Sequence, residues 1–210
     1  MSLIYLVLGL AALVVIVALI WRGLSTRTSI PCPSWLGWMV EMDNPILRHN
    51  SARVIISHLA LTPGMKVLDM GCGPGRLSIP LARAVGESGE VTAFDMQEKM
   101  LERVQAKARA EGLQNIRFVQ GKAGDGLLGK NRFDRVLLVL VLGEIPEQQT
   151  ALSEIFESLK PGGLLSITEV IADPHFQRRG KVRELTSSAG FAEQAFFGNA
   201  ISYTLNFAKP

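Results

Sequence analysis

Short apolar runs alternate with longer stretches of helical periodicity from about residue 59 to the end of the chain. Short apolar runs bounded by turn residues are typical of strands. The stretches between them repeat apolar residues three or four positions apart, as one face of a helix does. This alternation predicts an α/β fold with a mostly parallel sheet. We expect strands at 66–69, 90–95, 116–120, 135–142, 164–170, 191–197 and 201–207, and helices at 45–59, 77–85, 97–111, 148–159 and 178–188.

The first apolar stretch differs from the others because residues 3–21 contain no charged side chain. A helix of that length, at about 1.5 Å per residue, spans nearly the hydrocarbon core of a bilayer. Tyr5 and Trp21 lie near its two ends, where amphipathic rings favour the lipid interface, and Arg22 and Arg27 follow it. We therefore expect a single transmembrane anchor that leaves the rest of the chain in the cytoplasm.

Cleavage as a signal peptide is the alternative to an anchor. Met1-Ser2 provides no basic start and no A-x-A-like cleavage site follows, so the anchor is the interpretation that we keep. The chain then divides into an anchor at 1–22, a linker and interfacial segment at 23–44, and one α/β domain at 45–210. A chain of 210 residues, 48% of them hydrophobic, can bury one good core, which agrees with a single folded domain.

Three residues of the linker each leave two interpretations open. Trp35 and Trp38 either lie in the lipid interface or pack onto the folded domain. Cys32 is either a site of lipid modification or an ordinary buried thiol. The chain has one other cysteine, Cys72, and this spacing fits no zinc site, so we expect neither a metal nor a disulfide framework. The net charge of only +3 does not indicate a nucleic-acid partner.

One predicted strand leads directly into a glycine-rich loop and then a helix. The strand ends with Asp69, and Gly71, Gly73 and Gly75 follow at alternate positions. Glycines leave no Cβ between the backbone and a ligand, and the start of a helix points free N–H groups towards it. Such a unit holds a mononucleotide-sized ligand at the edge of a parallel sheet. Asp95 ends the next apolar run, where a carboxylate accepts hydrogen bonds from a ribose diol.

The glycine spacing separates two classes of enzyme. The dinucleotide fingerprint G-x-G-x-x-G has its third glycine where this chain has Arg76, so a nicotinamide-dependent enzyme is the weaker alternative. The acid, the three alternating glycines and the spaced Asp95 resemble the class I S-adenosylmethionine-dependent methyltransferases. The resemblance runs from about Leu59 to the C-terminus. It implies a Rossmann-like, seven-stranded sheet with helices on both faces and a closing antiparallel hairpin, and S-adenosylmethionine as the cofactor.

The ligand of an open α/β sheet lies beyond the carboxyl ends of its strands, and this rule selects the cofactor contacts. Met96, after the second strand, can lie against the adenine ring. The resembled family often has an acid directly after the glycine that follows the third strand. This chain has Lys122 there and its next acid at Asp125, so the backbone of Ala123 is the alternative contact. The expected cofactor-binding residues are Asp69, Gly71, Cys72, Gly73, Gly75, Asp95, Met96, Lys122 and Ala123.

The candidate catalytic residues follow the fourth and fifth strands. Glu144 lies where the methyl group would be transferred and can orient or deprotonate an acceptor, and the alternative is a solvated acid at the start of a helix. His175 can act as a base near neutral pH, and the alternative is a surface histidine in a turn. Methyl transfer mainly requires alignment of the acceptor, so the sequence contains no motif that names it.

The sequence thus predicts a membrane-anchored, S-adenosylmethionine-dependent methyltransferase with a lipophilic acceptor, which is a lipid head group, a quinone-like ring or a similar molecule. Two alternatives stay open: a methyltransferase of a soluble metabolite or protein that is anchored only for location, and a non-catalytic binding scaffold. A basic cluster has two interpretations. It is either a solvated helix face or a contact with anionic lipid, and the second would support a membrane location. Its members are Arg178, Arg179, Lys181 and Arg183.

Overall fold

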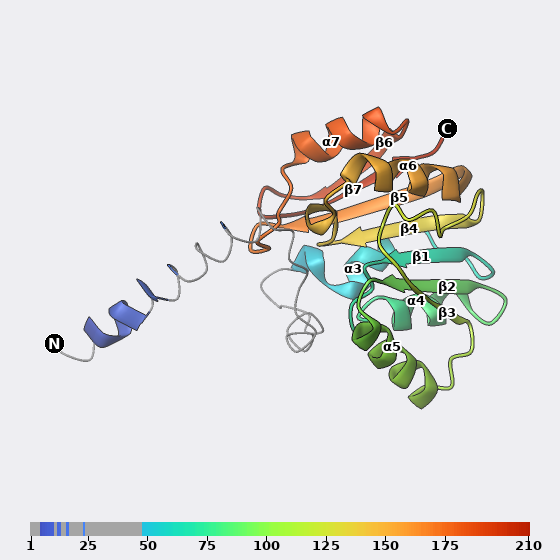
Figure 1. Ribbon diagram of the computed structural model, residues 1–210, viewed down its shortest axis with the longest axis horizontal. Coiled ribbons are helices and arrows are strands. Elements are labelled where there is room, and N and C mark those ends of the chain that lie inside the picture. Colours follow the sequence, from blue (N-terminus) through green and yellow to red (C-terminus); the bar gives the residue numbers. More distant parts are fainter. Residues whose placement is uncertain (1–4, 11, 14–15, 17–22, 24–47) are drawn as a thin grey trace.

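The computed structural model of the chain describes residues 5–10, 12–13, 16, 23 and 48–210. A seven-stranded sheet of order β3-β2-β1-β4-β5-β7-β6 forms the centre of the domain (Figure 1). The first five strands in this order pair in parallel, and β7 pairs antiparallel with β5 and β6. The predicted Rossmann-like sheet with a closing hairpin is therefore confirmed. The strands are β1 Lys66–Met70, β2 Glu90–Asp95, β3 Ile116–Gln120, β4 Phe133–Val139, β5 Leu159–Val170, β6 Ala192–Gly198 and β7 Ser202–Ala208.

Helices cover both faces of the sheet, as expected for parallel strands that are apolar on both sides. Val67 of β1 packs in a core cluster with α3 and α4, and its neighbour Leu68 packs in the opposite cluster with α6 and α7. A third cluster joins α4 and α5. The helices are η2 Arg48–Asn50, α3 Ala52–Ser57, α4 Ser78–Val85, α5 Glu98–Ala110, η3 Leu142–Glu144, α6 Gln148–Ser158 and α7 Arg179–Ser188, of which η2 and η3 are 3-10 helices.

Two strand boundaries differ from the prediction by three residues or more. The strand predicted at 135–142 ends at Val139, because Leu140 has a φ of +61° and turns the chain out of the extended conformation. The strand predicted at 164–170 begins earlier, at Leu159, and includes Pro161 and the two glycines after it. A proline followed by two glycines favours a turn in sequence, but here these residues continue β5 past a register shift in its pairing with β4.

Most of the predicted anchor at 1–22 and of the segment at 23–44, including Trp35, Trp38 and Cys32, lies outside the described residues. Residues 5–10, 12–13 and 16 are helical, and their large apolar side chains are exposed. No helix within the described parts of the chain has both the length and the apolar character required to cross a bilayer.

Candidate active site

The glycine loop between β1 and α4 turns sharply and leaves part of its backbone bare. Gly71, Gly73 and Gly75 have φ values of +68°, +51° and +89°, which side chains rarely allow. A Cβ at Gly71 would lie 2.5 Å from Val141, and one at Gly75 would lie 3.1 Å from Val104. A Cβ at Gly73 would meet none of the described protein atoms within 4 Å. Two of the glycines therefore permit close packing, whereas Gly73 presents its backbone to open space.

Asp95 faces this bare backbone from the end of β2. Its Oδ2 accepts a hydrogen bond from the Gly73 N–H at 2.9 Å, and its Oδ1 accepts one from the Gln97 N–H at 2.8 Å. Burial raises the pKa of the Asp95 carboxyl above its ordinary value, although these N–H groups oppose the shift. Three backbone N–H groups, those of Gly73, Met96 and Gln97, bind this carboxylate, which has about four acceptor sites. Asp95 can therefore still accept a hydrogen bond from a diol next to Gly73.

Asp69 and Cys72 lie beneath the loop. Ser78 Oγ donates a hydrogen bond to Asp69 Oδ2 at 2.6 Å, which ties the end of β1 to the start of α4. Burial raises the pKa of Asp69 to about 6, against the opposing effects of Ser78 and Arg76. The Cys72 thiol is buried in the cluster between α4 and α5, and this burial raises its pKa well above the ordinary value. Asp69 thus supports the loop from below, and the Cys72 thiol is directed into the core between α4 and α5.

Two exposed apolar side chains, Met96 and Leu127, lie in the segments that follow β2 and β3. Met96 is 44% exposed and Leu127 is 49% exposed. Leu127 lies against Gly121, because a Cβ at Gly121 would collide with the Leu127 side chain. Met96 is also near the end of β3, because the Gln120 side chain donates a hydrogen bond to the Met96 carbonyl at 3.4 Å. These side chains offer an apolar surface to a flat ring. The sequence predicted Met96 for this role but not Leu127.

The loop after β3 is fixed by two carboxylates, one within it and one from α6. Asp125 Oδ2 accepts a hydrogen bond from the Lys122 N–H at 3.0 Å. Glu154 accepts hydrogen bonds from the N–H groups of Gly124 and Leu128 at 2.8 and 3.0 Å. Asp125 therefore closes a turn within this loop.

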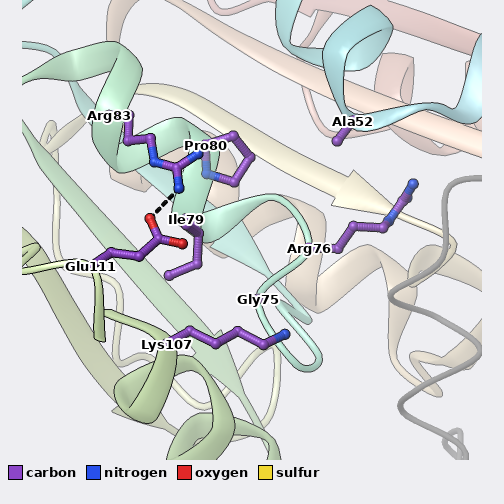
Figure 2. A pocket seen from close by; sticks show the side chains of 8 residues that line it. All are labelled: Ala52, Gly75, Arg76, Ile79, Pro80, Arg83, Lys107 and Glu111. Carbon is purple, nitrogen blue, oxygen red and sulfur yellow. Dashed lines mark hydrogen bonds and ion pairs between the residues drawn. The ribbon is translucent and has the colours of Figure 1, made fainter. Parts of the chain in front are cut away.

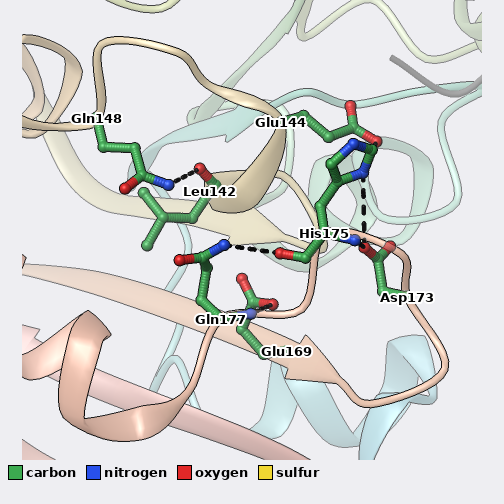
Figure 3. A network of polar contacts seen from close by, with 7 residues as sticks. All are labelled: Leu142, Glu144, Gln148, Glu169, Asp173, His175 and Gln177. Carbon is green, nitrogen blue, oxygen red and sulfur yellow. Dashed lines mark hydrogen bonds and ion pairs between the residues drawn. The ribbon is translucent and has the colours of Figure 1, made fainter. Parts of the chain in front are cut away.

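The structure brings the two predicted catalytic residues together beyond β4 and β5 (Figure 3). His175 Nδ1 lies 3.8 Å from Glu144 Oε1 and 3.9 Å from Asp173 Oδ1, and the His175 N–H donates a hydrogen bond to Asp173 Oδ1 at 2.6 Å. His175 is 5% exposed, so its interpretation as a surface histidine is wrong. A shielded imidazole beside two carboxylates can take a proton from a bound acceptor.

One short segment after β4 touches both halves of the site. Leu140 has the positive φ that ends β4, which is uncommon for a bulky residue and typical of functional positions. The bend sets Val141 against Gly71 of the glycine loop. Two residues later, a Cβ at Gly143 would collide with the backbone oxygen of His175, so glycine is needed there. The glycine loop and the His175 loop are therefore both packed on residues 141–143.

A third carboxylate, Glu169, is buried under the loop that carries His175. Its Oε2 accepts a hydrogen bond from the Gln177 N–H at 3.0 Å, and its Oε1 has no hydrogen-bond partner among the described residues. Burial raises the pKa of Glu169 to about 8, and the charges of Asp173 and Glu144 add to this shift. Gln177 also donates through its side chain to the His175 carbonyl at 2.8 Å (Figure 3). Protonated Glu169 thus helps to hold the His175 loop.

A surface depression of about 340 Å³ lies on the helical side of the glycine loop, between α4 and α5 (Figure 2). Arg83 and Glu111 form an ion pair along one side of it. Lys107 Nζ donates a hydrogen bond to a carbonyl of the glycine loop at 2.7 Å, and Arg76 Nη1 donates one to the Asn50 carbonyl at 2.6 Å. These cations support the back of the loop, and the depression lies away from the open space over Gly73.

Comparison with known proteins identifies the family. A family model described as a methyltransferase domain matches residues 61–201. The chain belongs to this methyltransferase family. The demethylmenaquinone methyltransferase of Staphylococcus aureus (strain MRSA252) is 36% identical over 115 residues, which are 55% of this chain and 47% of that protein. The demethylmenaquinone methyltransferase of Lactococcus lactis subsp. lactis (strain IL1403) is 42% identical over 100 residues, 48% of this chain and 40% of that protein.

This methyltransferase chain thus matches less than half the length of those two relatives. Among solved structures, a SAM-dependent methyltransferase from Aquifex aeolicus has a TM-score of 0.77 and 21% sequence identity. The match covers 86% of this chain and 100% of that one, which shows that the two share a fold.

S-adenosylmethionine is the cofactor of this methyltransferase domain. The carboxyl edge of the sheet fits its parts. The open space over Gly73 admits a ligand against bare backbone, and the lone pairs of Asp95 suit ribose hydroxyls. The exposed side chains of Met96 and Leu127 suit the adenine ring. The contact through the backbone of Ala123 stays a prediction.

Sequence reasoning missed the residues that hold the site from behind. Glu154 of α6 binds backbone amides of the loop after β3, whereas Gln177 binds the His175 carbonyl within its own loop. Nothing in the segments around these two residues marks either of them. Arg76 did give a signal, because it departs from the dinucleotide pattern. Its guanidinium joins the glycine loop to Asn50 in η2, and that contact explains why a long cation stands there.

Proposed function

We propose that this protein transfers the methyl group of S-adenosylmethionine to a lipophilic small-molecule acceptor, with a quinone-like ring as the preferred class. The observation that carries the proposal is the shielded pair of Glu144 and His175 next to the glycine loop. Similarity to proteins named demethylmenaquinone methyltransferases supports a quinone-like acceptor. The reduced form of such a ring has hydroxyl groups from which a base can take a proton.

The chemistry divides between cofactor and protein. S-adenosylmethionine, when bound, supplies a methyl group on a sulfonium, which is already a good leaving group. The protein then has to orient the acceptor and remove a proton from it, and alignment contributes much of the rate. We assign both tasks to Glu144 and His175. Asp173 positions His175 because its carboxylate accepts a hydrogen bond from the backbone N–H of His175.

We also infer that residues 1–22 anchor the protein in a bilayer, with the methyltransferase domain at 45–210 on the cytoplasmic side. Tyr5, Leu6, Val7 and Leu8 are consecutive helical residues and all four are exposed. Consecutive residues of a helix point in different directions, so this helix is apolar around its circumference. Lipid is the solvent that suits such a surface.

The acceptor is tested with the full-length protein in lipid vesicles that contain a prenylated naphthoquinol lacking its ring methyl group. Methyl-labelled S-adenosylmethionine is added, and the label is followed into the extracted lipid. We expect labelled quinol from the native protein and much less from Gly73→Ala when the cofactor is below saturation. Label confined to the protein, or found only on water-soluble acceptors, would contradict the proposal.

The assigned residues are tested by Glu144→Gln and His175→Asn. General acid–base catalysis contributes about 10²- to 10⁴-fold, so we expect kcat to fall by at least about tenfold in either variant while cofactor affinity is unchanged. Glu147→Gln is the matched control, because this glutamate is exposed three residues after Glu144. Unchanged turnover at saturating cofactor would remove the substituted residue from the catalytic assignment.

A further inference from the structure

An apolar patch lies beside the active site at the carboxyl edge of the sheet. Ile171, directly after β5, is 46% exposed, and Ile201, in the turn between β6 and β7, is 53% exposed. The Ile171 N–H donates a hydrogen bond to the Ile201 carbonyl at 2.7 Å, which holds the two residues side by side. Phe196 of β6 is also exposed, and the Arg179 guanidinium lies 5.0 Å from the centre of its ring. We call Ile171 and Ile201 the edge patch.

Cations lie at the start of α7, at the other end of the loop that Ile171 begins. Arg178, Arg179 and Lys181 are exposed, and within the described part of the chain no carboxylate forms an ion pair with them. Arg183, the fourth member of the predicted basic cluster, differs because its guanidinium donates two hydrogen bonds to the Glu193 carboxylate. The cluster therefore divides into one paired arginine and three cations that are available to an external anion.

The edge patch belongs to the same loop as the proposed base. Ile171 begins the segment between β5 and α7, and Arg178 ends it. His175 lies between them and is buried with its imidazole beside Glu144. The segment thus has an outer apolar residue, an inner catalytic candidate and a basic end. The exposed apolar residue and the proposed base therefore belong to one loop, four residues apart.

We propose that the edge patch and the three cations dock the methyltransferase domain onto the surface of an anionic bilayer. Exposed apolar side chains beside cations are the composition of segments that lie in the lipid interface, and each nearby cation strengthens attraction to anionic lipid. Two acids lie nearby: Asp173 binds the His175 N–H, and Glu184 lies one turn beyond Lys181. The proposal rests on the proposed function, because a lipophilic acceptor is what requires the site to face lipid.

The docking surface is tested by lipid-quenching fluorescence on the full-length protein in vesicles. An environment-sensitive dye is attached to Ile201→Cys in a Cys32→Ser background, in which the buried Cys72 is left unchanged. The vesicles are phosphatidylcholine alone or an equal mixture with phosphatidylglycerol, each with brominated acyl chains. A second protein carries the dye at Lys99→Cys on α5. We expect strong quenching at position 201 in the anionic vesicles and little at position 99.

Charge reversal supplies the second arm. Arg178→Glu combined with Lys181→Glu should reduce quenching at position 201 to its value in neutral vesicles. High salt should cause the same reduction in the protein with its native charges, because salt screens the attraction between the cations and anionic lipid. The matched control, Lys99→Glu with Arg109→Glu, makes the same charge change on exposed residues of α5 and should leave quenching unchanged.

Absence of quenching at position 201 in anionic vesicles would overturn the docking surface, and so would equal quenching after charge reversal in a protein that melts like the native one. Neither result depends on methyl transfer. Failure to methylate lipophilic acceptors would instead contradict the proposed function and leave the quenching result unaffected.

Discussion

Gly73 is the residue at which cofactor binding can be tested with least disturbance of the fold. The φ of Gly73 is +51°, and a Cβ added there would face open space. Gly112, at the end of α5, is the matched control, because it has a φ of +68° and equally open surroundings. Alanine at either position carries a similar backbone cost of about 1–2 kcal/mol. We expect both variants to lose similar thermal stability, whereas only Gly73→Ala weakens S-adenosylmethionine binding, by roughly tenfold or more in calorimetry. Equal affinities would place the cofactor elsewhere.

Glu169 makes the stability of the protein depend on pH. The folded state keeps its proton up to about pH 8, whereas the unfolded chain releases it near the ordinary value of 4.5. The folded state binds more protons between these values, so the free energy of unfolding falls as pH rises, by up to about 1.4 kcal/mol per unit. Glu169→Gln keeps the size and shape of the protonated Glu169 side chain and cannot ionise.

We therefore expect Glu169→Gln to raise Tm by about 5 °C or more at pH 8 and to change it little at pH 5. Thermal melts across this range provide the measurement. Glu184→Gln, which changes an exposed glutamate of α7, is the control and should show no such trend. An equal change of Tm for Glu169→Gln at pH 5 and at pH 8 would show that Glu169 titrates normally.

At the scale of elements, α6 fixes the loop that faces the adenine side. Glu154→Ala would leave two amides of this loop without their acceptor, which lowers the free energy of unfolding by about 1–3 kcal/mol for each amide. We expect Tm to fall by several degrees and cofactor affinity to fall severalfold. Glu157→Ala on the same helix removes only an exposed ion pair with Lys130 and should be nearly neutral in both assays. Equal effects of the two variants would contradict this role of Glu154.

The elements also show what the sequence could and could not predict. Gly73 and Asp95 were predictable because local spacing places both at carboxyl ends of parallel strands, which meet at one edge. The end of β4 was not predictable, because Leu140 belongs to an unbroken apolar run and its bend opposes the preference of leucine. The start of β5 was not predictable either. Pro161 and the glycines after it read as a turn, but Gly162 pairs with Lys209 at the other end of the chain.

For the whole molecule, the proposed anchor predicts how the protein partitions. We expect the full-length protein to stay with membranes in alkaline carbonate, and a protein lacking residues 1–22 to be released, because a spanning helix is held by lipid rather than by charge. Protease added to inside-out vesicles should digest the domain, and protease added to right-side-out vesicles should leave it intact. Release of the full-length protein by carbonate would exclude a spanning helix.

The segment 141–143 gives the two ligands a thermodynamic link. Val141 rests on the glycine loop and Gly143 rests on the His175 backbone, so a shift at either end is transmitted over three residues. A cofactor that settles the first loop should preorganise the second for its acceptor, and by reciprocity the acceptor should tighten the cofactor by the same factor. We expect the acceptor to bind severalfold more tightly in the presence of S-adenosylhomocysteine than in its absence. A ratio of one would mean that the two halves of the site respond independently.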